Sequence, residues 1–338
     1  MTVLVTGGAG YIGSHTCVEL LNAGFDVVVY DNFSNSTPES LKRVMQITSK
    51  KLLTVCGDVH DKALLEKTLE GCDAVIHFAG SKAVGESVEK PLEYYDNNVY
   101  ATLCLLQSMR RMNIKKLIFS SSATVYGNPE FLPFTEAHPL RTTNPYGQTK
   151  LVIEEMLRNL HVSDPTWSIA ILRYFNPVGA HESGLIGENP QGIPNNLMPY
   201  IAQVAIGRRQ CVNVFGNDYP TKDGTGVRDY LHVVDLASGH LKALAFLDRP
   251  QCTAVNLGTG KGYSVLDVIH AFSKACGKEI PYAILPRRAG DIAEFYSDPS
   301  FAKELLGWEA KYDLDKMCED MWRFQCQNPK GYKEGYEE

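Results

Sequence analysis

The chain has 338 residues, of which 44% are hydrophobic and 21% charged, and its formal net charge is −6. These values are ordinary for a globular enzyme with a full hydrophobic core, and no basic stripe of the kind that binds nucleic acid is visible. No stretch approaches the roughly 20 apolar residues of a membrane span. The nine cysteines form no Cys-x-x-Cys pair, and the N-terminal apolar run lacks the basic flank of a signal peptide. We therefore expect a cytoplasmic protein with reduced thiols and no metal site.

Short apolar runs rich in β-branched residues alternate with segments of helical periodicity in the first half of the chain. The expected strands are Val3–Val5, Val27–Tyr30, Leu52–Cys56, Ala74–Phe78, Leu117–Phe119 and Ile169–Leu172. The expected helices are Ser14–Ala23, Lys62–Glu70, Pro91–Met112 and Pro145–Leu160. This alternation predicts an α/β fold in which helices cover both faces of a parallel sheet.

The pattern changes after about residue 176, where proline and glycine become frequent, as in 188–194 and 216–226. We expect residues 1–176 to form the larger domain and residues 177–338 to form mainly a smaller α+β domain that binds the substrate. Arg228–Leu247 and Ala254–Leu257 look regular again. The chain is therefore expected to return to the first domain near residues 228–257.

The glycines of Thr6–Gly13 lie between the first expected strand and the first expected helix. Gly7, Gly10 and Gly13 satisfy the spacing Gly-x-x-Gly-x-x-Gly. Glycine is needed there for a tight turn, for close approach of the backbone to a pyrophosphate, and for packing of the helix on the strand. A glycine triplet alone is a weak signal, but strand, glycines and helix stand in the required order. The segment predicts a doubly wound Rossmann domain whose first helix presents its N-terminus to a dinucleotide.

Asp31 ends the second expected strand, where a carboxylate binds the ribose hydroxyls of the adenosine. An acidic residue repels a 2′-phosphate, and no lysine or arginine follows before Lys42, so NAD is favoured over NADP. The alternative is that Asp31 only caps a turn. Residues after the third and fourth strands are also expected to lie beside the cofactor, namely Asp58, Val59, Phe78, Ala79 and Gly80.

The stretch Asn144–Lys150 carries the strongest catalytic signal. Asn144 is a good cap and Pro145 a good first residue for a helix, which places Tyr146 and Lys150 four residues apart on one helical face. A phenol with a pKa of about 10 is a poor base at neutral pH, but a neighbouring ammonium, together with a positive nicotinamide, favours the phenolate. The spacing alone also fits a surface pair without a role. Behind a dinucleotide fingerprint, it predicts a catalytic base.

Ser122 lies at the end of the fifth expected strand. Ligands of open α/β sheets bind beyond the carboxyl ends of the strands. The hydroxyl of Ser122 is expected to hold the reacting oxygen and to relay its proton to Tyr146. The alternative is that the serine-rich strand end only caps itself.

Together, the glycine fingerprint, the serine-rich strand end and Tyr-x-x-x-Lys resemble the extended short-chain dehydrogenase/reductase superfamily. Longer strings resemble the family of bacterial UDP-glucose 4-epimerases from Val3 to about Trp322, and these are His77–Gly80, Ala83–Ser87, Tyr94–Asn98, Arg173–Ala180, Gln191–Leu197 and Gly226–Tyr230. The resemblance implies an isomerase that interconverts UDP-galactose and UDP-glucose by inversion at C4. It implies hydride transfer to tightly bound NAD, a 4-keto intermediate, and a place in galactose metabolism. It also implies a homodimer, in which Pro91–Met112 and Pro145–Leu160 could pair with a partner's helices.

The resemblance implies residues for both ligands. Besides Ser122, Tyr146 and Lys150, further residues of the NAD site are Tyr11, Ile12, Asn32, Asn35, Ser36, Lys82, Asn97 and Tyr174. Besides Ser122 and Tyr146, residues of the UDP-sugar site are Phe175, Asn176, Asn196, Leu197, Phe215, Arg228, Arg288, Asp291 and Phe295. Arg228 and Arg288 should hold the pyrophosphate, a role that suits fixed guanidinium donors, and Asp291 the uridine ribose.

Phe295 lies four residues after Asp291. In the family, a tyrosine there marks epimerases confined to galactose and glucose, and a small residue marks those that also accept N-acetylated sugars. Phenylalanine keeps the bulk, so we expect poor turnover of UDP-N-acetylglucosamine. The alternative is that Phe295 packs in the core of the smaller domain while Tyr296 faces the sugar.

Two other functions fit parts of the sequence. A sugar-nucleotide 4,6-dehydratase of the same superfamily carries an Asp-Glu pair where this chain has Ala123-Thr124. A non-catalytic NAD-sensing module has no use for Ser122, Tyr146 and Lys150. Both are less favoured than the epimerase.

Overall fold

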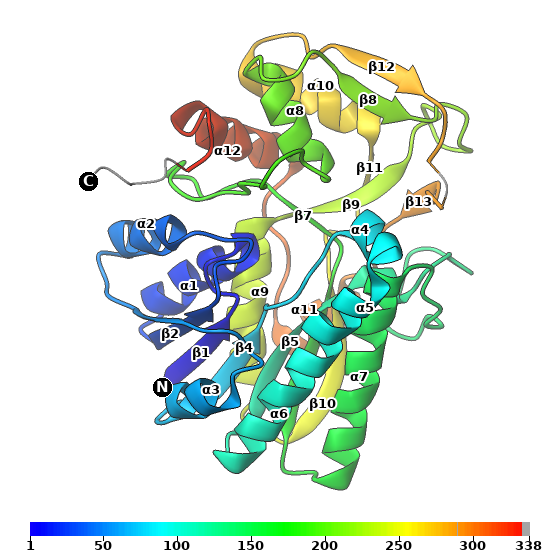
Figure 1. Cartoon of the computed structure of the whole chain (residues 1–338). Helices are drawn as coiled ribbons and strands as arrows, with labels where there is room; N and C mark the ends of the chain where they lie inside the picture. The colour runs from blue at the N-terminus through cyan, green and yellow to red at the C-terminus, as the bar shows by residue number, and fades with distance from the viewer. Residues whose placement is uncertain (289, 333–338) are drawn as a thin grey trace.

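The computed structural model describes residues 1–288 and 290–332. Its larger part, the lower part in Figure 1, is built on a seven-stranded parallel sheet of order β10-β6-β5-β4-β1-β2-β3. The strands are β1 (Thr2–Thr6), β2 (Asp26–Asp31), β3 (Leu53–Cys56), β4 (Ala74–His77), β5 (Lys116–Ser122), β6 (Ser168–Tyr174) and β10 (Gln251–Leu257). All six expected strands are present. The order runs outward from β1 in both directions, which confirms the doubly wound Rossmann architecture.

Helices cover both faces of this sheet because successive strand residues point to opposite sides and both sides are apolar. In β1, Val3 and Val5 pack into one apolar cluster and Leu4 into another. The first face is covered by α1 (Tyr11–Asn22), α2 (Pro38–Thr48), α9 (Val233–Phe246) and α11 (Ser300–Leu306). The second face is covered by α3 (Lys62–Leu69), α6 (Ala101–Arg111) and α7 (Pro145–Ser163).

The smaller, upper part has its own sheets and its own apolar cluster. One sheet contains β7 (Asn176–Val178), β9 (Val227–His232), β11 (Gly262–Ser264) and β13 (Glu294–Phe295), and the other pairs β8 (Val212–Phe215) with β12 (Tyr282–Leu285). The helices α8 (Leu197–Ala205), α10 (Val265–Cys276) and α12 (Leu314–Gln327) pack together around the cluster. β9 lies in this upper part, whereas α9 and β10, which follow it, lie on the large sheet (Figure 1).

The segment predicted as one helix over Pro91–Met112 is more complex. It runs without a break as α5 (Pro91–Tyr94), a π-helical turn η1 (Tyr95–Tyr100) and α6, and the short helix α4 (Val84–Glu89) precedes it. Single π-turns inside α-helices are frequent at functional sites.

Helix α2 was not expected from the sequence. Its start signals are nevertheless present, because the side chain of Thr37 accepts a hydrogen bond from the backbone of Glu39, and Pro38 is the first helical residue. The helix was missed because its apolar positions are few and the surrounding segment is polar.

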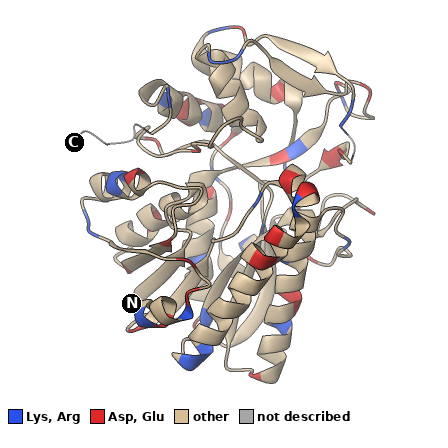
Figure 2. Cartoon of the chain, in the orientation of Figure 1, with Lys and Arg blue, Asp and Glu red and all other residues tan. Residues whose placement is uncertain are grey.

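Lysine and arginine residues, and aspartate and glutamate residues, are spread over both parts (Figure 2). Within the described residues, no helix is long and apolar enough to cross a membrane. All nine cysteines are free. Over the same part of the chain, no group of three or more metal-ligating side chains is arranged to hold an ion.

Candidate active site

The glycines Gly7 and Gly13, at the turn between β1 and α1, are packed too tightly for a side chain. Gly7 has a positive φ of 68°, and a Cβ there would lie 2.7 Å from the backbone nitrogen of Ala79. A Cβ on Gly13 would lie 2.4 Å from the carbonyl oxygen of Gly7. Gly10 is the N-cap residue of α1, and no side chain caps this end of the helix. The first helical N–H groups, those of Tyr11, Ile12 and Gly13, are thus available to an anionic group, as a dinucleotide requires.

Asp31 is buried at the end of β2 beside this turn. Its Oδ2 accepts from the backbone N–H of Ala9 at 3.0 Å, and its Oδ1 accepts from the N–H of Phe33 at 2.9 Å and from the hydroxyl of Ser36 at 2.8 Å. The carboxylate therefore does cap a turn, as the alternative interpretation held. A carboxylate has about four acceptor positions, so capping leaves room for a ribose hydroxyl.

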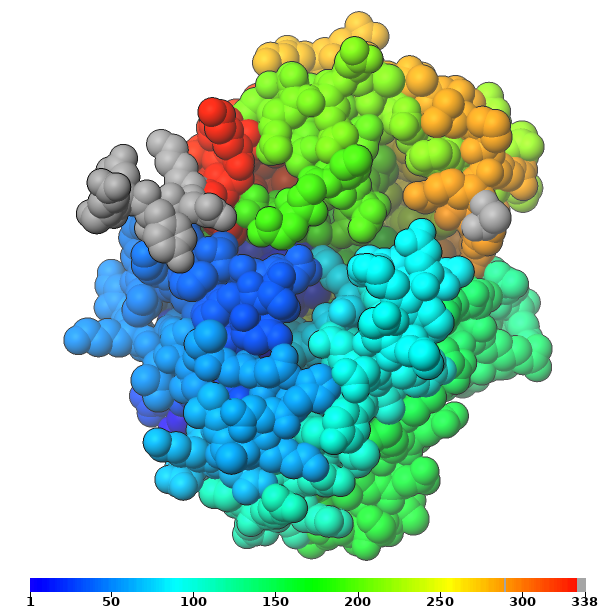
Figure 3. All heavy atoms as spheres, in the orientation of Figure 1, coloured from blue at the N-terminus to red at the C-terminus, as the bar shows by residue number. Residues whose placement is uncertain are grey.

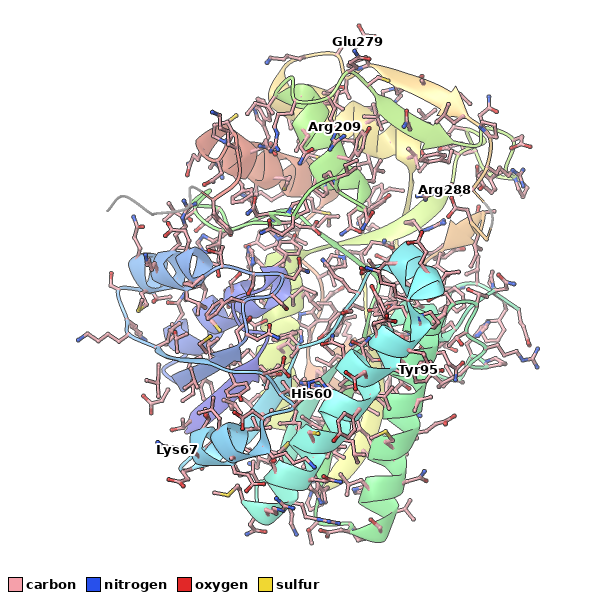
Figure 4. The ribbon with its side chains drawn as sticks, in the orientation of Figure 1. His60, Lys67, Tyr95, Arg209, Glu279 and Arg288 are labelled. Atoms are coloured by element: carbon pink, nitrogen blue, oxygen red, sulfur yellow. The ribbon has the colours of Figure 1, made fainter. Side chains whose placement is uncertain are left out.

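The loop after β3 approaches the π-turn. Asp58 accepts from Asn32 Nδ2 at 2.7 Å and from Nδ1 of His60 at 2.5 Å. Burial raises the pKa of Asp58, but the hydrogen bonds from His60 and Asn32 outweigh it and hold the pKa below its usual value. His60 also reaches the backbone of Asp96 at 3.3 Å, so it lies where the two segments meet (Figure 4). Of the other residues expected here, Val59 is buried in the core and Asn35 is exposed.

Helix α7 begins as predicted and presents Tyr146 and Lys150 to the end of β5. The side chain of Asn144 caps the helix by accepting from the N–H of Gly147 at 2.8 Å. Lys150 is buried, and its Nζ donates to the carbonyl of Ser120 at 2.8 Å and lies 5.9 Å from the centre of the Tyr146 ring. Burial lowers the pKa of Lys150 to about 8.

The sequence prediction for Tyr146 combined the ammonium of Lys150 with a positive nicotinamide, and in the structure burial opposes the ionisation of this phenol. Burial raises the pKa of Tyr146, and the hydroxyl of Ser122 acts in the opposite direction. The ammonium of Lys150 is directed to the carbonyl of Ser120 instead of the phenol oxygen. Lowering the pKa of Tyr146 therefore requires positive charge in addition to that of Lys150.

Ser122 ends β5 and caps the short 3₁₀ turn η2 (Ala123–Val125) that follows. Its hydroxyl oxygen accepts from the N–H of Thr124 at 3.2 Å and from the hydroxyl of Thr124 at 3.0 Å. The self-capping alternative is therefore realised, but only through the oxygen, so the hydroxyl hydrogen remains available. Thr124 was missed by the sequence reasoning, although a threonine two residues after a serine at a strand end is itself a turn signal.

The π-turn brings Asn97 and Asn98 to the loop after β4. Asn97 Nδ2 donates to the hydroxyl of Ser81 at 2.9 Å. Asn98 is buried, accepts from the N–H of Ser81 at 2.7 Å, and donates to the carbonyl of Ser81 and the hydroxyl of Thr149, both at 3.0 Å. Asn98, which sequence reasoning did not single out, thus joins the loop that starts at Phe78 to the catalytic helix.

A buried carboxylate bridges the two parts of the molecule. Oε1 of Glu188 accepts from Lys82 Nζ at 3.2 Å and from Asn196 Nδ2 at 2.7 Å. Lys82 follows β4 in the lower part, and Asn196 is the N-cap residue of α8 in the upper part, next to Leu197. Glu188 was not predicted as a site residue, because nothing near it in the sequence indicates this partnership.

The residues expected to hold the nucleotide come together in the upper part. The guanidinium of Arg288 lies 4.7 Å from the centre of the Phe215 ring, and its Nε donates to Asp291 at 2.9 Å (Figure 4). Arg228 is fixed on β9 by a 2.8 Å hydrogen bond from Nη1 to the carbonyl of Ile292. This set offers two guanidinium groups, one carboxylate and one aromatic face.

Phe295 belongs to an aromatic cluster beside the site. Its ring centre lies 5.4 Å from that of Phe175 and 4.6 Å from that of Phe134. The ring of Tyr296 lies beside Gly262, because a Cβ on that glycine would be 3.5 Å from Cδ1 of Tyr296. The structure therefore places Phe295, and not Tyr296, next to a residue expected to contact the sugar nucleotide.

Tyr174 and Asn176 flank Phe175 at the end of β6 and the start of β7. The hydroxyl of Tyr174 lies 2.5 Å from Nε2 of His240, and the ring of His240 also packs on Phe78. Tyr174 is paired directly with Ser122 across β6 and β5. Residues expected to contact the cofactor and the sugar therefore lie side by side at the carboxyl ends of β5 and β6.

The surface is hollowed between the two parts, where the green segment of the upper part faces the blue and cyan segments of the lower part (Figure 3). A different hollow of about 490 Å³ opens at the opposite end of the sheet, near Lys116 and Thr166. Lys116 is already paired with Asp248 at 2.9 Å. Because ligands of open α/β sheets bind beyond the carboxyl ends of the strands, the first hollow is the candidate site.

Comparison with known proteins agrees with this geometry. A family model described as GDP-mannose 4,6 dehydratase matches residues 4–321. UDP-glucose 4-epimerase of Bacillus subtilis (strain 168) is 60% identical over 336 residues, covering 98% of this chain and 99% of the relative, and that of Homo sapiens is 58% identical, covering 98% of both. A crystal structure of UDP-glucose 4-epimerase from Bifidobacterium longum in complex with NAD+ and UDP is 58% identical, covers 98% of this chain and 100% of its own, and superimposes with a TM-score of 0.95. The chain belongs to the UDP-glucose 4-epimerase family of the extended short-chain dehydrogenase/reductases.

Proposed function

We propose that the chain interconverts UDP-galactose and UDP-glucose by inversion at C4, through a 4-keto sugar and with tightly bound NAD, as part of galactose metabolism. The observation that carries this proposal is the convergence of Ser122, Tyr146 and Lys150 at the carboxyl end of β5, between the glycine turn of the lower part and the arginines of the upper part. Membership of the epimerase family supports it.

The lower part fits NAD by its own geometry. The cradle formed by Gly7 and Gly13 leaves no room for side chains, and the uncapped start of α1 suits a pyrophosphate. Asp31 suits the adenosine ribose and disfavours a 2′-phosphate. Lys150 and Asn97 would lie along the remainder of the cofactor. When bound there, NAD would supply the acceptor, and its reduced form the donor, for hydride transfer at C4.

Side chains of the protein transfer the proton of the sugar 4-hydroxyl group. Tyr146 removes the proton of the 4-hydroxyl group and later returns it, as a general base and acid. Ser122 offers its free hydroxyl hydrogen to the same sugar oxygen. Lys150, whose Nζ lies 5.9 Å from the centre of the Tyr146 ring, adds positive charge near the phenol, which favours the phenolate together with the positive nicotinamide.

The residues proposed to bind the nucleotide allow the sugar ring to rotate while the substrate stays bound. Arg228, Arg288 and Asp291 lie on the upper part, away from the reacting carbon, and suit a diphosphate and a ribose. Binding energy from this distant half of the substrate retains the keto intermediate while the ring rotates. The substrate is thus bound through its nucleotide and reacts at its sugar, which suits an inversion at one carbon.

The two other functions predict different outcomes. Dehydration needs an added acid and base, and Ala123-Thr124 supplies neither carboxyl group. An NAD-sensing module would bind the cofactor without converting any UDP-sugar. The alignment of Ser122, Tyr146 and Lys150 supports turnover.

One incubation tests the proposal. Purified protein is mixed with UDP-galactose and no added cofactor, and UDP-glucose is assayed. We expect conversion, and NAD in the supernatant after acid denaturation, because the reaction has no net redox change and the cofactor need not leave. A protein that loses NAD on gel filtration and needs it resupplied each cycle would contradict tight binding. Bound NAD without conversion would support the sensing module.

We also infer a homodimer. Apolar side chains are exposed along α4, α5, η1 and α6, the surface next to α7, and these are Val84, Val88, Leu92, Tyr95, Tyr100 and Leu103. Leu92 is 79% exposed, and Tyr95 projects from the same helix (Figure 4). A contiguous apolar surface of this kind marks an interface. Sedimentation equilibrium should give twice the chain mass, and Leu103→Glu should shift it toward one chain.

The free thiols support a cytoplasmic location. We expect no loss of activity after purification in the presence of a thiol reductant. A requirement for an oxidising environment would contradict this location.

A further inference from the structure

The catalytic helix carries a third ionisable side chain on the face of Tyr146 and Lys150. Glu154 lies one helical turn beyond Lys150 and is 0% exposed. A buried carboxylate is tolerated only when it is paired and hydrogen-bonded. Its partners show what it is placed to do.

Glu154 joins the helix to two adjacent strands. Its Oε1 accepts from the hydroxyl of Ser121 on β5 at 2.6 Å and from Nε of Arg173 on β6 at 3.0 Å, and its Oε2 accepts from Nη2 of Arg173 at 2.6 Å. Ser121 and Arg173 are direct partners across the sheet. The bidentate pair fixes both the position and the orientation of the carboxylate.

The strand residue held by Glu154 lies between two residues of the site. Ser121 follows Ser120, whose carbonyl accepts from Lys150, and precedes Ser122. Arg173 likewise precedes Tyr174. A shift of α7 by one turn, about 5.4 Å, would separate the phenol from the serine hydroxyl, and the Glu154 contacts oppose such a shift.

We propose that Glu154 is a positioning residue for the reaction, whose carboxylate fixes α7 against β5 and β6 and whose negative charge keeps the side chain of Lys150 in the ammonium form. Glu154 contacts neither ligand site directly. Its kinetic consequences rest on the proposed function, whereas its effect on Lys150 does not.

The charges around Lys150 support this role. Burial lowers the pKa of Lys150 to about 8, and Glu154 acts in the opposite direction. His77 faces Lys150 from β4, and burial lowers its pKa to about 3, so it is neutral at neutral pH. Burial also raises the pKa values of Tyr146 and Tyr174, so both are neutral. Glu154 is therefore the anion that favours the ammonium form of Lys150, and the cations of Arg173 and Arg158, which bond Glu154, reduce this effect.

The decisive variant is Glu154→Gln, which keeps the shape and removes the charge. In protein labelled with ¹³C at the lysine Cε positions, the NMR titration of Lys150, assigned with Lys150→Arg, should move to lower pH by about one unit. The alkaline limb of kcat should move with it, while KM for UDP-galactose stays within about two-fold. A folded variant with an unmoved titration would overturn the proposal.

Two further variants separate charge from architecture. Arg158→Gln removes a half-exposed partner of Glu154, 2.7 Å away, but leaves the carboxylate, so the titration should not move to lower pH. Glu154→Gln leaves Arg173 buried without its counter-charge, which destabilises the protein. The double variant Glu154→Gln/Arg173→Met removes both charges. If only the double variant folds, it tests the positioning role instead of the charge, because both charges of the pair are removed. With the bridge from α7 to β5 and β6 lost, kcat for UDP-galactose should fall while KM changes little, and a wild-type kcat in it would overturn the proposal. A wild-type protein without epimerase activity would refute the proposed function and leave the titration result intact.

Discussion

Thr124 donates its hydroxyl hydrogen to the hydroxyl oxygen of Ser122, 3.0 Å away, in the turn that ends β5. The backbone N–H of Thr124 donates to the same oxygen. With its acceptor positions occupied by the turn, Ser122 has its own hydrogen to donate toward the site. The orientation of a proposed catalytic hydroxyl is thus set by its neighbour two residues along the chain.

Thr124→Val should therefore lower kcat. Loss of a hydrogen bond worth about 1 kcal/mol corresponds to roughly a five-fold decrease. Steady-state kinetics with UDP-galactose measure it, with KM expected to change little. Thr124→Ser keeps the hydroxyl and should retain most of the activity. Equal kcat values for Thr124→Val and the wild type would show that Ser122 needs no such orientation.

Tyr146→Phe should abolish most turnover and leave UDP binding nearly intact. General acid and base groups contribute about 10²–10⁴-fold. Lys150→Ala should reduce kcat comparably, because the charge that favours the phenolate is lost. Binding of UDP, followed by calorimetry, serves as the control for folding. Wild-type rates in Tyr146→Phe would remove the mechanism.

The pH dependence of kcat should report Lys150. Its pKa is lowered to about 8 by burial, so raising the pH through this value removes the proton and with it the positive charge beside Tyr146. We expect kcat to fall on the alkaline side of about pH 8. In Lys150→Arg the guanidinium keeps its charge, so the remaining activity should lack this limb. An unchanged limb in Lys150→Arg would assign it to another group.

Asp31→Ala should raise the binding of NADP relative to NAD, because it removes the charge that repels a 2′-phosphate. It should also weaken NAD retention, since Asp31 holds the backbone of Ala9 and the hydroxyl of Ser36. Asp31→Asn keeps an acceptor oxygen and should separate the two effects. Equal binding of NAD and NADP by the wild type would contradict the role of Asp31 in cofactor choice.

Phe295→Cys should gain activity on UDP-N-acetylglucosamine, which the wild type should turn over poorly. The ring of Phe295 packs on Phe175 and Phe134, and forcing an added N-acetyl group against such a wall costs typically about 1–3 kcal/mol. The comparison is of kcat/KM for the plain and N-acetylated substrates. Phe295→Tyr, which keeps the bulk, is the matched control. Comparable wild-type kcat/KM values for both substrates would contradict the proposed role of Phe295 in excluding N-acetylated sugars.

Much of the fold followed from the sequence because its signals are local. Hydrophobic runs predicted all six strands of the first half, and Asn144 with Pro145 predicted the start of α7 to the residue. The glycine turn was predictable because its requirement is steric. These features depend on residues within a few positions of one another.

Other residues of the site could not be predicted because their partners are distant in the chain. Asn98 and Thr149 are 51 positions apart, and Lys82 and Glu188 are 106 apart. The raised pKa of Tyr146 depends on how deeply the finished fold buries it. The sequence identified Tyr146 and Lys150 as a pair but gave no sign that the ammonium bonds the carbonyl of Ser120.

The π-turn η1 changes the direction in which residues face around the helix axis between α5 and α6. A residue in an α-helix occupies about 100° of rotation, so deletion of one residue within Tyr95–Tyr100 would restore a regular helix and turn everything beyond it by that amount. Asn98 would then lose its hydrogen bonds to Ser81 and Thr149, or Leu105 would leave the apolar cluster between α6 and the sheet. The π-turn therefore lets the amide side chains at one end of this segment face the ligand cleft while the apolar residues at the other end face the sheet. A uniform α-helix could not orient both sets of residues in this way.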